Sequence, residues 1–259
     1  MPWTEAATDR SALVAKRFGA RAGQYDEHAL LQRESAATLA AFIASLGGLP
    51  PAGLVAEIGC GTGLLAELLA PKAERYLATD IAPEMLERCR LRLHGRAGAG
   101  VALMDGQRPA FAQPPAAIVS NLAAQWFVDP VAGLERLAGQ TPFFAFAVPL
   151  AGSFPEWREA FRALGREPGL LPMPKGDDIM RALTTLAART GKRTRFRTEA
   201  HTLRYANARA FADSFRNIGA DQPRSGYRPG PIRPVLERFA KGMEATAFVL
   251  YGLIKKESA

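Results

Sequence analysis

A short apolar strand that runs directly into three closely spaced glycines constrains this chain more than any other feature. The strand is Leu54–Ile58, the glycines are Gly59, Gly61 and Gly63, and an apolar helical stretch follows at 64–70. In an open parallel sheet, the first strand-to-helix turn offers free backbone N–H groups and lets a ligand approach closely. The pattern therefore predicts a ligand site at the end of this strand.

The same alternation of strand and helix continues along the chain. The expected strands are 54–58, 76–80, 101–105, 117–120 and 143–148, with two more at 201–205 and 247–254. Further helices are expected at 83–92 and 131–137, and after residue 148 apolar side chains recur at helical spacing. Strands that alternate with helices imply a parallel sheet covered on both faces.

We expect a single α/β domain over residues 1–259, because 48% hydrophobic residues suffice for one large core. The largely helical segment 11–46 would form an N-terminal lid that ends at Gly47. The cofactor-binding core would be 52–150, and a helical insertion at 151–195 would cap the substrate. Residues 196–259 would then complete the sheet with strands and a helix.

Carboxylates lie at the ends of the first three expected strands. Glu57 precedes the first glycine by two residues and can lie beneath the loop. Asp80 can accept hydrogen bonds from two ribose hydroxyls, or else cap the helix that begins near Pro83. Asp105 can accept from the exocyclic amine of adenine, or else belong to a turn with Gly106.

The glycine spacing distinguishes between nucleoside ligands. A dinucleotide fingerprint would need glycines at 59, 61 and 64, but position 64 is Leu. The acidic-x-Gly-x-Gly-x-Gly pattern instead resembles the loop that binds S-adenosylmethionine, so we expect this cofactor. The residues expected to bind it are Glu57, Gly59, Cys60, Gly61, Thr62, Gly63, Asp80, Ile81, Met85, Asp105 and Gly106.

The amino-acid composition limits which kinds of partner and ligand can be expected. Lys and Arg outnumber Asp and Glu by 33 to 25, a formal charge of +8 that favours an anionic partner, although a basic surface without a partner is the alternative. The basic residues are dispersed along the sequence, so we expect no nucleic acid as a partner.

The chain has two cysteines, Cys60 and Cys89, which argues against disulfides and a metal site. Without a secretion signal or a membrane-length apolar run, we expect a soluble, cytoplasmic protein that binds no membrane.

Four stretches outside the glycine loop carry further motifs: residues 17–33, Ser-Asn-Leu-Ala-Ala-Gln-Trp at 120–126, Gly-Ser-Phe-Pro-Glu-Trp at 152–157 and Asn-Ile-Gly-Ala at 217–220. They are similar to stretches of one family, the malonyl-acyl-carrier-protein O-methyltransferases of biotin synthesis. The similarity runs from about Val14 to Glu257. It implies a Rossmann-like methyltransferase fold with a mostly parallel seven-stranded sheet and helices on both faces.

The resemblance also implies a reaction, methylation of the free carboxylate of malonyl-acyl-carrier protein. A carboxylate with a pKa of about 4 is already ionised and needs no base, so positioning and exclusion of water can provide the acceleration. We therefore assign no catalytic residue. The resemblance places Tyr25, Gln32 and Arg33 on the lid, and Asn121, Gln125 and Trp126 around the methyl-transfer pocket, with Asn121 also at the cofactor. Tyr25, Gln125 and Trp126 would position the substrate.

Some of these assignments have plain alternatives. Trp126 could belong to the core, and Arg33 could be a solvated helix charge. The family often carries a Tyr-His pair where this chain has Ala247-Phe248, and proline 142 replaces an expected glycine. The first of these departures leaves the acceptor open.

Two other functions therefore stay under consideration. One is methylation of a small-molecule hydroxyl, which would need a base such as His28 or His201. The other is a non-methylating assembly factor. The positive charge would suit an acidic carrier protein, and we expect the helix bearing Arg158, Arg162 and Arg166 to dock it.

Overall fold

The computed structural model describes residues 5–220 and 232–256, and side chains from residue 10 onward, so Glu257 at the end of the family similarity lies outside it. The strands are β1 Leu54–Ile58, β2 Arg75–Asp80, β3 Ala99–Leu103, β4 Ala117–Asn121, β5 Phe143–Pro149, β6 Lys192–Tyr205 and β7 Met243–Lys256. The α-helices are α1 Glu5–Gly19, α2 Tyr25–His28, α3 Leu30–Ser45, α4 Ala66–Leu69, α5 Pro83–Arg92, α6 Pro130–Gly139, α7 Pro155–Arg162, α8 Gly176–Thr190, α9 Ala208–Asn217 and α10 Arg233–Arg238. Two 3-10 turns are η1 Ala70–Lys72 and η2 Ala124–Trp126.

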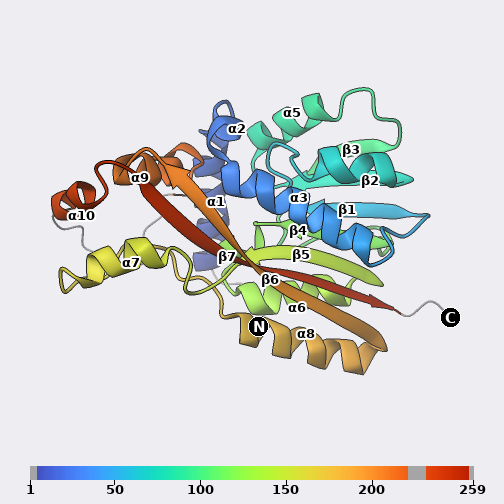
Figure 1. Ribbon diagram of the computed structural model, residues 1–259. Coiled ribbons are helices and arrows are strands. Elements are labelled where there is room, and N and C mark those ends of the chain that lie inside the picture. The colour runs from blue at the N-terminus through green and yellow to red at the C-terminus, as the bar shows by residue number, and fades with distance from the viewer. Residues whose placement is uncertain (1–4, 221–231, 257–259) are drawn as a thin grey trace.

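The expected seven-stranded sheet is present, in the order β3-β2-β1-β4-β5-β7-β6 (Figure 1). Strands β1 to β5 are parallel, whereas β7 runs antiparallel to both β5 and β6. Successive crossovers lead from β1 outward to β3 and then back to β4 on the other side of β1. Ligands bind at such a switch point, beyond the carboxyl ends of the strands.

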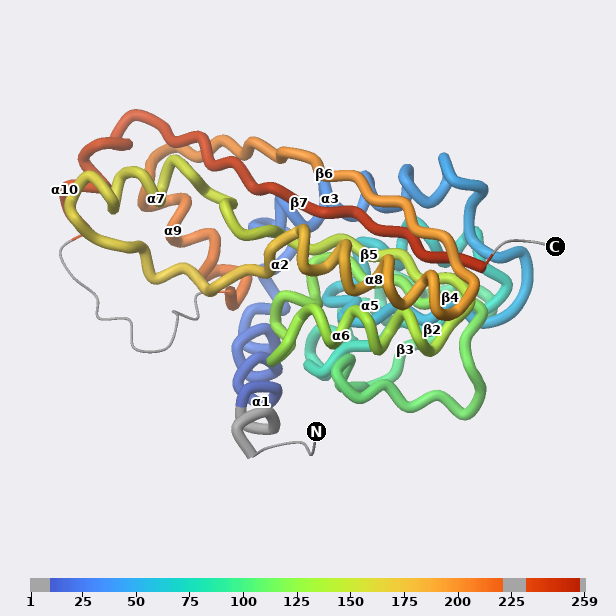
Figure 2. Tube along the Cα trace, turned by 90° about the horizontal axis from the view of Figure 1, so that it is seen from below, coloured from blue at the N-terminus to red at the C-terminus, as the bar shows by residue number. Residues whose placement is uncertain are grey.

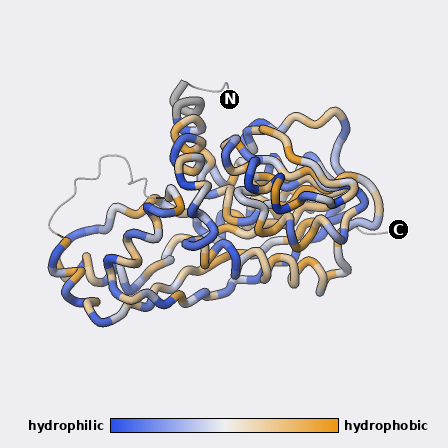
Figure 3. Tube along the Cα trace, turned by 90° about the horizontal axis from the view of Figure 1, so that it is seen from above, coloured by the Kyte–Doolittle hydropathy of each residue, from blue (hydrophilic) through white to orange (hydrophobic). Residues whose placement is uncertain are grey.

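Helices cover both faces of the sheet. On one face, Leu39 and Ile43 of α3 and Met85 of α5 belong to a buried cluster with the side chains of β1 and β4 that point that way. On the other face, Leu134 of α6 and Leu183 of α8 are fully buried in a second cluster. Figure 3 shows how hydrophobic residues concentrate in the central strands between these layers. The central parallel strands β1, β4 and β5 are therefore buried on both sides, whereas β3 at the edge of the sheet is partly exposed.

The segment 11–46, expected to be largely helical, is divided among α1, α2 and α3. The chain turns between Gly19 and Gln24 and again at Ala29. Gly19 packs against α5 so closely that a Cβ there would lie 2.3 Å from Glu84 Oε2. Because the chain turns between α1 and α3, the two helices point in different directions. Figure 2 shows α1 projecting from the body of the molecule.

The last two strands are longer than the sequence pattern predicted. β6 begins at Lys192 and pairs with β7 along its whole length, so the helical insertion expected at 151–195 ends at Gly191. Residues 192–200 are mostly polar because β6 is an edge strand, where exposed arginines such as Arg193 and Arg195 can face solvent. Backbone hydrogen bonds to β7 stabilise this strand, so it does not need the alternation of apolar and polar residues that marks a half-buried strand.

The expected insertion also divides into two parts with different neighbours. α8 packs on the sheet through Ile179 and Leu183. α7 instead joins α9, α10 and the far ends of β6 and β7 around Trp157 and Phe211. Figure 2 shows α7, α9 and α10 together at one end of the molecule. The two parts of the expected insertion therefore belong to different hydrophobic clusters.

Within the described ranges, no helix has the length and apolar character needed to cross a membrane. The same part of the chain holds no group of three or more His, Cys, Asp and Glu side chains arranged to bind a metal ion.

Candidate functional site

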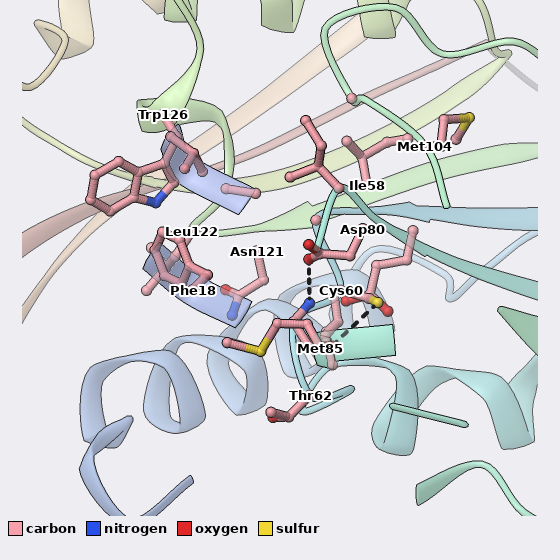
Figure 4. A pocket seen from close by; sticks show the side chains of 18 of the residues that line it. Phe18, Ile58, Cys60, Thr62, Asp80, Met85, Met104, Asn121, Leu122 and Trp126 are labelled. Carbon is pink, nitrogen blue, oxygen red and sulfur yellow. Dashed lines mark hydrogen bonds between the residues drawn. The ribbon is translucent and has the colours of Figure 1, made fainter. Parts of the chain in front are cut away.

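A cavity opens at the carboxyl ends of β1, β2 and β4, where the strand order reverses. It encloses about 900 Å³ of space, part of it open to solvent. The glycine loop forms its floor, and residues from α1, α2, α3 and η2 close its sides (Figure 4). The cavity is concave and lined by apolar side chains with a few polar groups among them, as small-molecule sites usually are.

The glycine loop needs glycine for two separate reasons. Gly59 has φ +70°, and a Cβ there would lie 2.3 Å from the Cβ of Ala123. Gly61 also has positive φ, +54°, but a Cβ there would meet nothing within 4 Å. Gly59 thus allows tight packing against the segment after β4, whereas Gly61 presents its backbone to open space in the cavity.

Asp80 fastens this loop. Its Oδ2 accepts a hydrogen bond from Gly61 N at 2.8 Å, and its Oδ1 accepts from Ala82 N at 2.9 Å. Burial raises the pKa of Asp80, while the backbone hydrogen bonds oppose this shift. The residue that caps α5 is Ala82, so Asp80 does not act as the helix cap considered from the sequence. It lines the cavity and bonds to the glycine loop.

Glu57 lies beneath the loop as a buried side chain. Its Oε2 accepts from the Tyr76 hydroxyl at 2.7 Å, the one hydrogen bond recorded for this carboxyl among the described residues. Burial raises the pKa of Glu57 to about 8, although the hydrogen bond from Tyr76 opposes the shift. A positively charged ligand group in the cavity would favour the ionised carboxylate again.

Asp105 lies two residues beyond the end of β3, not on the strand as the sequence pattern suggested. Its carboxylate accepts from Ser11 Oγ at 3.1 Å and from Gln107 N at 2.9 Å. Gln107 Nε2 in turn donates to Ser11 Oγ at 2.9 Å. Ser11 and Gln107 line the cavity although the sequence analysis missed both, because a single polar residue in a helix or loop carries no motif.

Aromatic side chains form the side of the cavity nearest the N-terminal helices. Phe18 of α1 meets Trp126 edge to face, with ring centres 5.2 Å apart, and lies 6.3 Å from the ring of Tyr25. Figure 4 shows Phe18, Leu122 and Trp126 grouped on one side. Burial raises the pKa of Tyr25, so its hydroxyl stays protonated. Trp126 is half-buried and lines the cavity.

Asn121, at the end of β4, is held by α3. Its Oδ1 accepts from Ser35 Oγ at 2.7 Å, and its Nδ2 donates to the carbonyl oxygen of Gln32 at 3.1 Å. Both Asn121 and Gln32 line the cavity. Ile81, Met85, Cys60, Thr62 and Gly106 line it as well.

Three of the predicted site residues are not part of the cavity wall. Arg33 is exposed and donates to the carbonyl oxygen of Asp26 at 3.2 Å, which agrees with the alternative of a surface helix charge. Gln125 is buried behind the wall, where its Nε2 donates to Leu122 O at 2.6 Å. Gly63 packs against Cys89, whose Sγ would lie 2.9 Å from an added Cβ. In the structure, these three residues are therefore not among those that line the cavity.

Asp26 connects α2 to the glycine loop and to α5. Its Oδ1 accepts from Thr62 Oγ1 at 2.5 Å, and its carboxylate also pairs with Arg92, which in turn bonds Glu67. Through these contacts, the N-terminal segment is attached directly to the loop that forms the floor of the cavity.

The fold and the site define a Rossmann-like methyltransferase. Residues 55–138 match the methyltransferase domain family. The solved structure of DhpI with S-adenosylhomocysteine superposes with a TM-score of 0.57 at 17% identity, covering 99% of this chain and 100% of that one. Magnesium protoporphyrin IX methyltransferase from Synechocystis PCC 6803 with bound S-adenosylmethionine gives 0.56 at 14% identity, covering 98% and 100%.

The relatives narrow the class to a family. The chain is 30% identical to the malonyl-[acyl-carrier protein] O-methyltransferase of Magnetococcus marinus over 94% of this chain and 92% of that protein. It is 36% identical to the biotin biosynthesis bifunctional protein BioCD of Bordetella avium over 96% of this chain, and spans 53% of that longer protein. This chain belongs to the malonyl-[acyl-carrier protein] O-methyltransferase family, whose cofactor is S-adenosylmethionine.

The residues present fit this cofactor. A buried carboxyl whose pKa is raised suits a cationic amino group, and the open space at Gly61 admits a ligand against the backbone. The apolar side chains of Ile81 and Met85 line the same cavity as the acidic Asp80 and could flank an adenine ring.

Proposed function

We propose that this chain transfers the methyl group of S-adenosylmethionine to the free carboxylate of malonyl-acyl-carrier protein, the substrate named for its relatives. One observation carries the choice of acceptor. Along the described part of the chain, the residues that line the cavity include no histidine or lysine, and its carboxyls, Glu57, Asp80 and Asp105, are assigned to the cofactor in this proposal. A hydroxyl acceptor needs a base near the methyl group, whereas a carboxylate is ionised already.

In this proposal the acidic side chains hold the cofactor. Glu57 faces its amino group, Asp80 its ribose hydroxyls and Asp105 the amine of adenine. The cofactor supplies an electrophilic methyl group on a sulfonium sulfur. The chain's own contribution is to bind, orient and exclude water.

The acceptor would lie on the aromatic side of the cavity. Tyr25, Gln32 and Asn121 offer it neutral hydrogen-bond donors, and Trp126 and Phe18 exclude water. Neutral donors orient a carboxylate without pairing it with a full positive charge, so the oxygen stays nucleophilic. The helices α1 to α3 would act as the lid expected at residues 11–46, with Gln125 supporting Trp126 from behind.

Replacing His28 tests the choice of acceptor. His28 lies on α2 outside the cavity wall, so His28→Gln should retain malonyl-carrier methylation within about twofold. Loss of a general base typically costs about 10²–10⁴ in rate. A loss of that size, together with methylation of a hydroxyl compound, would favour the small-molecule alternative. Cofactor binding without product on any acceptor would favour the assembly-factor alternative.

We further propose that the carrier protein docks on α7 and the turn after it, because α7 ends at Arg162 and Arg166 lies beyond the helix that was expected to bear it. Arg162 is exposed, Arg158 donates from Nε to Ser153 O at 2.9 Å, and the Arg166 guanidinium lies 6.0 Å from the ring centre of Phe161. Changing all three to Glu should raise the KM for the carrier at low salt and have less effect at high salt. Arg181→Glu on α8 is the control. Equal kinetics of the two variants at low salt would remove the docking role.

A further inference from the structure

A chain of polar side chains leads from the cavity to the outer edge of the sheet. Asn121 in the cavity wall accepts from Ser35 Oγ at 2.7 Å, and Ser35 Oγ accepts from the Tyr251 hydroxyl at 3.3 Å. The Tyr251 oxygen lies 2.7 Å from His201 Nε2, and His201 Nδ1 lies 3.2 Å from Glu34 Oε2. We call these five residues the relay.

The interior of the relay is removed from solvent. Ser35 and Tyr251 are 0% exposed and His201 is 8% exposed, whereas Glu34 at its outer end is 51% exposed. Its members come from β4, α3, β7 and β6, and α3 packs across all three of those strands. Burying polar groups costs free energy unless each has a partner, so every member constrains the orientation of the next.

The donors and acceptors of the relay can be assigned in one consistent direction. Ser35 uses its single hydrogen on Asn121, and Tyr251 uses its hydrogen on Ser35. The Tyr251 oxygen then accepts from His201 Nε2–H, and Nδ1 of the same ring faces the Glu34 carboxylate. Burial raises the pKa of Tyr251, which keeps its hydroxyl available as a donor.

The charged groups around His201 are compatible with this assignment. Glu34 of α3 faces one ring nitrogen, and Tyr251 of β7 faces the other. Arg197 of β6 acts electrostatically on Tyr251, and its guanidinium pairs with Glu199 on the same strand. Glu34 also acts on Tyr205 further along β6.

We propose that Ser35, Tyr251, His201 and Glu34 are positioning residues that fix the carboxamide of Asn121 in the cavity. The proposal rests on the proposed function only in treating this cavity as the methyl-transfer site. Without Ser35, the carboxamide of Asn121 would keep only the hydrogen bond from its Nδ2 to the carbonyl oxygen of Gln32, and the looser carboxamide would align cofactor and acceptor less well. Removing one link should therefore act at a distance, on a residue that the changed side chain does not touch.

Side-chain NMR tests the relay without any substrate. The chain contains three asparagines, Asn121, Asn207 and Asn217, so selective ¹⁵N-asparagine labelling gives three carboxamide groups. Asn121→Asp identifies the signal of Asn121 by its loss. Tyr251→Phe, which keeps the ring, and His201→Gln should both move the Asn121 carboxamide signal. Tyr205→Phe is the matched control, because it removes a tyrosine hydroxyl from the same strand pair but outside the relay.

Kinetics and thermal melting separate positioning from stability. Ser35→Ala and Tyr251→Phe should lower kcat by about 2- to 10-fold, the cost of a lost hydrogen bond, while KM for the carrier changes less. Ser35→Cys, which keeps a weak donor, should recover part of the loss. An Asn121 signal that stays unmoved in folded Tyr251→Phe and His201→Gln proteins would overturn the relay. An absence of methylation by the wild type, with the signal moved as expected, would instead refute only the proposed acceptor.

Discussion

At the scale of single residues, Glu57 links cofactor binding to protons. Its pKa of about 8 means that the carboxyl is mostly protonated at neutral pH in the free protein. A cationic amino group would stabilise the ionised form, so binding would release a proton. The folded protein also holds this proton more tightly than the unfolded chain, for which the pKa is 4.5. The Glu57 contribution to the free energy of unfolding should therefore fall as pH rises from 4.5 to about 8.

This linkage predicts how cofactor affinity depends on pH. Between about pH 6 and pH 8, the Kd for S-adenosylmethionine should fall as pH rises, by at most about tenfold per unit. Glu57→Gln should bind more weakly and lose most of this slope. Titration calorimetry in buffers of different ionisation enthalpy would measure both the Kd and the proton released. A slope that is the same in both proteins would show that Glu57 does not face the amino group.

The residues that the sequence placed correctly at the cavity differ in kind from those it misplaced. Glu57, Asp80 and Asn121 end parallel strands, and the carboxyl ends of such strands meet at one edge of the sheet. Arg33 of α3 and Gln125 of η2 are each next in sequence to a residue that lines the cavity, but neighbouring residues of a helical segment point in different directions. A residue's place in the sequence therefore predicts that it lies near the cavity, but not whether its side chain points into it.

At the scale of elements, α2 acts through Asp26. Asp26→Ala removes the hydrogen bond from Thr62 and the ion pair with Arg92. The Kd for the cofactor should rise about 2- to 10-fold, because the loop and the N-terminal segment lose a direct connection. The free energy of unfolding should change by at most about 1 kcal/mol, since this ion pair is partly solvated.

Binding and denaturation measured on the same preparations would check this prediction. Asp178→Ala on α8 is a suitable control, because Asp178 is an exposed carboxylate whose recorded partner is Arg181 on its own helix. Equal cofactor affinity of the two variants would mean that α2 does not influence the loop.

α8 should contribute to stability and not to the site. Leu183 is fully buried between this helix and the sheet. Leu183→Ala should lower the free energy of unfolding by about 2–5 kcal/mol, the usual cost of a cavity in a core. Urea denaturation would measure this loss. The folded variant should bind the cofactor with a Kd within about twofold of the wild type, and a much larger change would return α8 to the role of a substrate cap.

The observed ends of helices and strands agree with the expected ones where the pattern of apolar residues is strong. Helix α5 spans the expected 83–92, and β5 extends the expected strand by one residue at its end. The polar first half of β6 was not foreseen, because it is stabilised mainly by pairing with β7. The partner strand β7 lies far away in the sequence, so the residues of a polar edge strand such as the first half of β6 show little of this pairing themselves.

At the scale of the whole molecule, alternating strands and helices predicted a parallel sheet covered on both faces, and the family resemblance implied its seven strands and its class. The acceptor was harder to predict, because Ala247 and Phe248 stand where the family often has Tyr and His. In the structure, Ala247 pairs with His201 across β6 and β7, and His201 contacts the Tyr251 hydroxyl. A histidine–tyrosine contact is thus present between these strands, which lessens the weight of that departure.

The most direct test of the account is the intact mass of malonyl-acyl-carrier protein after incubation with the enzyme and S-adenosylmethionine. If this chain methylates the malonyl carboxylate, each malonyl carrier should gain one methyl group. Acetyl-carrier protein, which has no free carboxylate, should gain nothing. An unchanged malonyl carrier in the presence of enzyme that binds the cofactor, or equal methylation of the acetyl carrier, would contradict it.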